Sequence, residues 1–125
     1  MSFRMLQADV LRWAKDKDLL HIKNAPKQFM KFIEEVFEFK TEMDTFNEVN
    51  SDSEFSKGYQ KYIEHNLKLE MGDIFVTLII LCEQIGIDPE ECLSMAYEKI
   101  KNRRGMTLHG NFYKQEDLEG MGWEK

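Results

Sequence analysis

Apolar residues recur at helical spacing along most of this chain, and the pattern predicts an all-α fold. Leu6, Val10, Trp13 and Ala14 fall on one face of a first helix, whose other positions are mainly polar. The polar segment 15–23 interrupts this spacing and predicts the first turn.

A second helix is predicted to start at Asn24-Ala25-Pro26, with Asn24 as its cap and Pro26 in its first turn. Its apolar positions continue to about Phe46. Residues 47–58 are rich in Asn, Ser, Asp and Gly and form the main predicted loop. A third helix follows over about 59–85 and ends at Gly86.

The second half of the third helix, residues 74–82, is apolar on every side. Its β-branched residues also suit a buried strand, but the segment continues without a break from a polar helical stretch, which favours a helix. A helix that is apolar all round must be covered on all sides, and four short helices supply too little cover. The pattern therefore predicts a homodimer or homotetramer.

Asp88-Pro89-Glu90-Glu91 is a second helix start, with a cap, a proline and acids that face the positive end of the helix dipole. The fourth helix is predicted to run to about Arg104. Residues 105–125 follow the helical core, and alternation around Gly110-Asn111 predicts either a small hairpin or an ordered C-terminal arm. The glycine-rich end of the arm is expected to be loose.

The 125 residues suffice for one domain, predicted to span 1–125 with a helical core over about 3–104. The formal net charge of −6 argues against stable nucleic-acid binding, which needs an excess of Lys and Arg. Both cysteines lie in or beside apolar runs and are expected to be reduced core thiols. No signal-peptide pattern opens the chain, and its longest apolar run falls far short of the ~20 residues that cross a bilayer. We expect a cytoplasmic protein without membrane contact.

Two acidic clusters on different predicted helices carry the candidate chemistry. The second helix holds Glu34, Glu35 and Glu38, and the third holds Glu70 and Asp73. At about 100° per residue, each cluster presents its carboxylates within an arc of about 100° or less. The two clusters are therefore expected to meet in one pocket.

Both clusters interrupt apolar faces, where carboxylates lose hydration and like charges are tolerated only when they are paired or bound to metal. The nearby lysines, Lys31, Lys40 and Lys68, are expected on other faces or at the rim. All-oxygen ligands favour Mg²⁺, with Mn²⁺ as a substitute. Gly72 would let another backbone or a ligand come close, although a tolerated packing glycine gives the same pattern.

The pattern EExxE, a spacer of a few tens of residues, and ExxD before a strongly apolar helix resembles the MazG-like, all-α nucleoside triphosphate pyrophosphohydrolases. Gly-Ile-Asp-Pro-Glu-Glu and the basic helix end at 99–105 fit the short, single-domain type of this group. The resemblance covers about residues 24–105. It implies a four-helix bundle that dimerises, sometimes into a dimer of dimers.

The same resemblance implies Mg²⁺ held by Glu35, Glu38, Glu70 and Asp73, with Glu34 as a further ligand or as the group that orients the attacking water. Glu34, Glu35 and Glu38 are the predicted catalytic residues. The implied reaction cuts nucleoside or deoxynucleoside triphosphates between the α and β phosphates and serves nucleotide-pool house-cleaning. Aromatic side chains flank Glu38 where smaller ones are usual, so the substrate pocket departs from the group.

Six residues are predicted to bind substrate. Lys99, Asn102 and Arg103 share an arc of about 100° and suit phosphate oxygens, although a basic helix end is also favoured by the helix dipole. Trp13, Asn24 and Gln28 offer an aromatic face and amides for the base or sugar, and Trp13 fits a core position equally well.

Two other functions were weighed against this enzyme. A ferritin-like di-iron bundle needs Glu-x-x-His on two helices, and no glutamate of this chain is followed three residues later by histidine. A non-catalytic helical interaction module with an acidic binding face stays the alternative.

Overall fold

The computed structural model describes residues 1–122 and is mainly helical, as the apolar spacing predicts. The chain divides into two compact units, and each is described by itself. The first covers Met1–Asp88 and the second begins at Pro89. The four-helix bundle and its dimerisation stay predictions.

The first unit consists of three α-helices and a 3₁₀ turn. These are α1 (Phe3–Asp16), η1 (Ile22–Asn24), α2 (Ala25–Ser51) and α3 (Lys57–Ile85). Ser2 and Ser56 cap α1 and α3, because each hydroxyl accepts a hydrogen bond from a backbone N–H one turn later. Gly86 ends α3 in the left-handed conformation, at φ 78°, as predicted.

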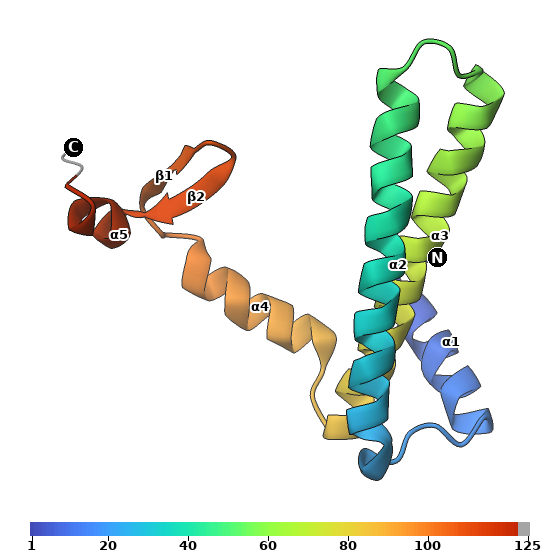
Figure 1. The fold of residues 1–125 in the computed structure, drawn as a ribbon. Coiled ribbons are helices and arrows are strands. Elements are labelled where there is room, and N and C mark those ends of the chain that lie inside the picture. The colour runs from blue at the N-terminus through green and yellow to red at the C-terminus, as the bar shows by residue number, and fades with distance from the viewer. Residues whose placement is uncertain (123–125) are drawn as a thin grey trace. The chain divides into compact units, whose positions relative to one another are not determined.

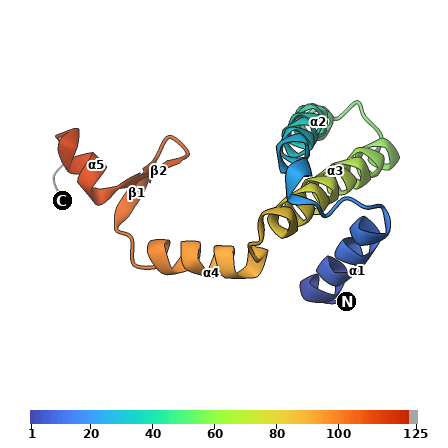
Figure 2. The same cartoon turned by 90° about the horizontal axis from the view of Figure 1, so that it is seen from below.

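Helices α2 and α3 form a long antiparallel pair, and α1 packs against α3 (Figures 1 and 2). Residues spaced by seven form the stripe of each long helix along this pair, which we call the α2–α3 seam. The seam residues used below are Gln28, Glu35, Glu42 and Val49 on α2, and Ile63, Glu70 and Thr77 on α3. These positions are polar except for Val49 and Ile63, which lie toward the connecting loop.

The second helix begins at Ala25 with Pro26 in its first turn, as predicted, but it runs past its predicted end. It continues to Ser51 instead of stopping near Phe46, and the loop shrinks to five residues, 52–56. Burial of Val49 in the seam explains the extension, since packing overrides the weak helix preference of the polar residues around it. Asn24 occupies the predicted N-cap position, but it has helical backbone angles and its side chain makes no capping hydrogen bond.

The second unit contains α4 (Pro89–Ile100), a hairpin and α5 (Gln115–Gly120). Helix α4 starts at its predicted proline but ends four residues before Arg104. The hairpin pairs β1 (Gly105–Leu108) with β2 (Asn111–Lys114). The predicted hairpin is thus confirmed. Helix α5, which buries Leu118, was not predicted. The end of the chain that was expected to be loose lies largely outside the described residues.

Backbone geometry fixes the hairpin at its turn and at its open end. His109 and Gly110 both have positive φ, 51° and 82°, as a two-residue turn with the right twist requires. At the open end, a Cβ on Gly105 would lie 2.1 Å from the carbonyl oxygen of Tyr113. Only glycine fits this close approach.

Several apolar side chains are exposed, most visibly on α4. Leu93 and Met95 are 71% and 66% exposed, and Cys92 is also exposed, so the predicted core position for this thiol is wrong. Cys82 is buried, as predicted. Among residues 1–122, no helix is both long enough and apolar enough to cross a membrane.

Candidate metal centre

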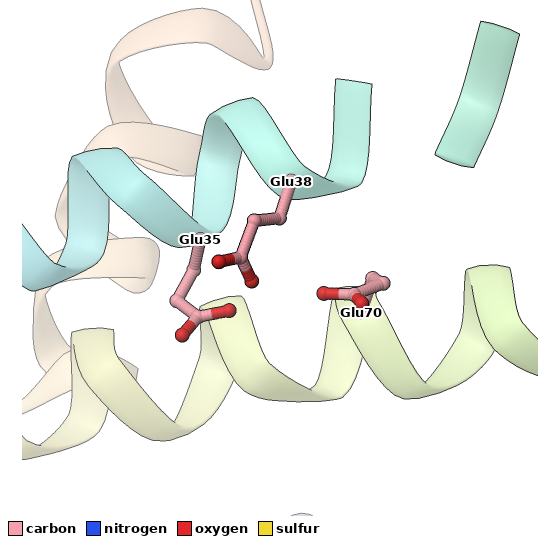
Figure 3. A group of neighbouring side chains, drawn as sticks. All are labelled: Glu35, Glu38 and Glu70. Atoms are coloured by element: carbon pink, nitrogen blue, oxygen red, sulfur yellow. The ribbon is translucent and has the colours of Figure 1, made fainter. Parts of the chain in front are cut away.

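Three carboxylates from two helices meet in the α2–α3 seam. Glu35 and Glu38 extend from α2 toward α3, and Glu70 extends from α3 toward α2 (Figure 3). One carboxylate oxygen from each lies within 4.8 Å of the other two. The structure thus brings together three of the four predicted metal ligands.

The pairing of the long helices explains this meeting. The amide nitrogen of Gln28 donates a 3.2 Å hydrogen bond to the backbone carbonyl of Thr77, which sets α2 against α3. One heptad further along α2 is Glu35, and one heptad back along the antiparallel α3 is Glu70. A polar contact next to the site therefore fixes which acids face each other.

Two oxygens of the centre are buried without a partner. They are Oε2 of Glu35 and Oε2 of Glu70, and neither accepts a hydrogen bond from the described residues. Glu35 as a whole is only 7% exposed. Leaving a buried acceptor unsatisfied costs about 1–3 kcal/mol, and more when the group is charged. The centre is thus short of positive charge or hydrogen-bond donors.

Lys31 supplies part of the missing charge. Its ammonium lies 3.3 Å from Oε1 of Glu35 and 3.5 Å from Oε2 of Glu34. The hydrogen bond to Glu35 and the charges of both glutamates raise the pKa of Lys31. Lys31 is half-exposed at the rim, as predicted, and it reaches both glutamates because i,i+3 and i,i+4 positions are neighbours on a helix. One ammonium does not balance three carboxylates.

The pKa values reflect this imbalance. A hydrogen bond with Glu35 and the repulsion of its charge raise the pKa of Glu38. Burial raises the pKa of Glu70, and the charges of Asp73, Glu35 and Glu42 raise it further. Mutual repulsion of this kind is relieved by a proton or by a cation.

The remaining predicted acids lie at the margin. Glu34 is exposed and faces Lys31. Asp73 is exposed and falls outside the group of oxygens within 4.8 Å found among the described residues, although its charge reaches Glu70. Sequence reasoning missed Glu42, whose charge also acts on Glu70. Its position seven residues after Glu35 is the signal that could have found it.

The predicted base and sugar contacts belong to the first unit. Trp13 is 51% exposed and lines an open groove with Val10 and Val76, so it is not a core residue. Gln28 lies in the seam, where its amide nitrogen donates a hydrogen bond to the backbone carbonyl of Thr77. Asn24 is half-buried in η1.

The predicted phosphate contacts belong to the second unit. Lys99, Asn102 and Arg103 line one open pocket at the end of α4, so the structure brings these three together. Lys101 lies outside the lining of this pocket and pairs with Glu98 at 2.7 Å.

Gly72 does not serve a close backbone approach within the described chain. Nothing lies within 4 Å of the position that a Cβ would take. Its helical neighbours leave this position open to solvent.

The donor set fits a hard divalent cation. All three converging groups are carboxylates, two of their oxygens are buried without partners, and no sulfur or imidazole joins the group among residues 1–122. Searches of protein-family models, curated proteins and solved structures found no match to this chain.

Proposed function

We propose that this chain is a Mg²⁺-dependent nucleoside triphosphate pyrophosphohydrolase. One observation carries the proposal: carboxylates of Glu35 and Glu70 face each other across the α2–α3 seam, each with a buried oxygen that lacks a partner. A centre of this kind suits a cation and then a polyanionic substrate. The resemblance of the EExxE and ExxD pattern to the MazG-like group supplies the reaction.

Glu35, Glu38, Glu70 and Asp73 are the proposed ligands, with Mn²⁺ as a substitute for Mg²⁺. Bound Mg²⁺ would polarise the α-phosphate, lower the pKa of water and neutralise the departing pyrophosphate. Because a triphosphate carries about −4 and the five acids together about −5, we propose two or three ions. Lys31 stays at the rim, where it limits the repulsion between Glu34 and Glu35.

In the proposed reaction, the oxygen of a water molecule forms a bond to the α-phosphorus. The bond from this phosphorus to the α–β bridging oxygen breaks, and its electron pair leaves with pyrophosphate. Glu34 orients the water and accepts its proton. Its exposed carboxylate, held on one side by Lys31, suits this role better than the crowded Glu38 does.

Substrate contacts complete the proposal. Within the second unit, Lys99, Asn102 and Arg103 are the proposed contacts for phosphate oxygens. Within the first unit, the exposed ring of Trp13 is the proposed stacking surface for a base. The exposed apolar side chains of α4 support a homodimer or homotetramer as the working form. We place the activity in the cytoplasm, as nucleotide-pool house-cleaning.

The test is to incubate the full chain with a panel of dNTPs and NTPs in Mg²⁺, and to measure monophosphate and pyrophosphate. We expect both products in equal amounts from at least one nucleotide. Replacing Glu38→Gln is expected to abolish turnover while the helical circular dichroism spectrum persists. The matched control is Asp44→Asn, an exposed acid on the same helix that pairs with Lys40. It should keep full activity.

Two results would contradict the proposal. Release of orthophosphate would place the cut at another bond. No turnover of any nucleotide, together with unchanged Mn²⁺ binding in the Glu38→Gln variant, would favour the interaction module, whose acids would then bind a protein partner.

A further inference from the structure

A basic pocket in the second unit lies apart in sequence from the acidic centre. It has a volume of about 500 Å³, and its lining is Lys99, Asn102, Arg103, Arg104, Lys114, Gln115, Glu116 and Glu119. Four cations thus outnumber two glutamates there, in a chain whose formal net charge is −6. Arg104, which is exposed, joins the lining after α4. Lys114 and Gln115 join it at the end of the hairpin, and the sequence pattern singled out neither.

The hairpin builds this pocket. The backbone N–H of Arg103 bonds to the carbonyl of Ile100 at 2.9 Å and turns the chain out of α4. Gly105 then pairs with Lys114 in the ladder, and the N–H of Gln115 donates a 2.8 Å hydrogen bond to the carbonyl of Arg104. Two basic segments about ten residues apart are therefore held side by side by backbone hydrogen bonds.

The cations of the pocket are available for a ligand. Within residues 1–122, Lys99, Arg103, Arg104 and Lys114 make no ion pair, although Glu116 and Glu119 line the same pocket. Arg103 and Lys114 are half-buried, so their charges are less screened than those of extended surface side chains. Lysine and arginine side chains without carboxylate partners attract anions. The planar guanidinium groups of the arginines suit phosphate oxygens in particular.

We propose that this pocket binds an oligophosphate chain in its own right, without divalent metal, and that Lys114 and Arg104 extend the phosphate contacts beyond α4. The inference rests on the proposed function for its choice of phosphate among anions. The ligand is either the phosphate tail of the nucleotide or the free pyrophosphate product. Asn102 and Gln115 add neutral amide donors beside the charges.

Calorimetric titration of the full chain in EDTA tests the proposal, with pyrophosphate, inorganic triphosphate, a nucleoside triphosphate and the bare nucleoside as probes. We expect the three phosphate compounds to bind and the nucleoside not to bind. Equal affinity for inorganic triphosphate and the nucleoside triphosphate would show that the pocket binds the phosphate tail of the nucleotide. Tighter binding of pyrophosphate than of either triphosphate would show that it binds the free product. Binding of the nucleoside triphosphate without either inorganic compound would overturn the proposal.

Three variants locate the binding. Lys114→Gln should weaken pyrophosphate binding about five- to tenfold. Lys101→Gln removes a cation of the neighbouring segment that is already paired with Glu98, and it should change the affinity about twofold or less. Glu119→Gln should tighten binding about two- to threefold, a gain that a folding defect cannot produce. Equal losses in Lys114→Gln and Lys101→Gln would show net charge alone at work and would overturn the proposal.

Mn²⁺ binding, followed by electron paramagnetic resonance, separates this inference from the proposed function. If no oligophosphate binds in EDTA while Mn²⁺ still binds and Glu38→Gln abolishes that binding, the pocket is refuted and the enzyme is not. If oligophosphate binds and Lys114→Gln weakens it while Mn²⁺ binding is absent, the pocket stands and the metal centre is refuted.

Discussion

The acidic centre of the first unit and the basic pocket of the second solve opposite electrostatic problems. Glu35 and Glu70 bury oxygens in a helix seam, where water is excluded and one lysine is the nearby counter-charge. The cations of the basic pocket keep access to solvent, with Arg104 exposed and Lys114 half-buried. Burial makes an unpaired charge costly, whereas a solvated charge costs little until a ligand arrives.

This difference predicts which of the two sites is stabilised by its ligand. The acidic centre is destabilising by itself and should gain stability from a cation, because binding to the folded form alone shifts the folding equilibrium. The basic pocket should neither gain nor lose much. Removing single charges should therefore have different consequences in the two units.

The largest effect is expected from Glu70→Gln. The change keeps the shape of the side chain but removes a ligand, so we expect Mn²⁺ affinity and nucleotide turnover to fall about 100-fold or more. At the same time, the metal-free protein should unfold at a higher temperature than the unsubstituted chain, because a crowded charge is gone. Titration with Mn²⁺, a turnover assay and thermal melts in EDTA measure the three quantities.

The matched control is Glu64→Gln, an exposed acid on the same helix that pairs with Lys68. It should leave metal affinity, turnover and melting temperature unchanged. A Glu70→Gln variant that melts lower in EDTA would contradict the view that this carboxylate is strained in the free protein.

The pH dependence of folding stability tests the strain at Glu70 in a second way. The folded-state pKa of Glu70 lies above its ordinary value of 4.5, so the folded chain binds this proton more tightly than the unfolded chain does. The stabilising effect of this proton is complete below pH 4.5 and is lost as pH rises through the raised pKa. We expect metal-free stability to fall over this interval, and Mg²⁺ to restore it at pH 7 but not at pH 4.5.

Chemical denaturation at several pH values, with and without Mg²⁺, measures this dependence. Other carboxylates titrate in the same range, so the difference between the unsubstituted chain and Glu70→Gln isolates the group. Parallel pH profiles for the two proteins would refute the assignment.

Much of the first unit could be predicted from the sequence, including the meeting of its acids. Glu35 and Glu70 are equally far from the middle of the predicted loop 47–58, so an antiparallel pair of helices sets them opposite each other. The exact loop could not be predicted, because Val49 is buried by a partner helix that no local pattern reveals. The position of Asp73 outside the converging oxygens likewise depends on helix rotation, which packing decides.

The second unit was harder to predict because its order comes from few residues. A single buried side chain, Leu118, anchors the short helix α5, which the local sequence pattern does not predict. The lining of the basic pocket comes from the end of α4 and from residues that follow the hairpin turn. Helical periodicity in the sequence identifies only the first group, Lys99, Asn102 and Arg103. The local sequence pattern does not show which distant residues the hairpin brings together.

A smaller effect is expected from Gln28→Ala, which removes the hydrogen bond that aligns the seam. Loss of this half-buried bond to the carbonyl of Thr77 should lower the free energy of unfolding by about 1 kcal/mol. Because the amide serves the helix pair, we expect a modest loss of Mn²⁺ affinity and an unchanged KM for nucleotide. A raised KM with normal stability would instead return Gln28 to its predicted role at the base or sugar.

The smallest effect is expected from Gly72→Ala, between the two acids of α3. Glycine within a helix is about 1 kcal/mol less favourable than alanine, and the new methyl group would meet nothing within 4 Å. The variant should therefore gain up to about 1 kcal/mol of stability and keep its Mn²⁺ affinity, measured by denaturation and metal titration. If turnover is lost while metal affinity is kept, a nucleotide or a second copy of the chain must approach this face during the reaction. That outcome would show that the open side of the acidic centre, in contrast to the basic pocket, is covered in the working form.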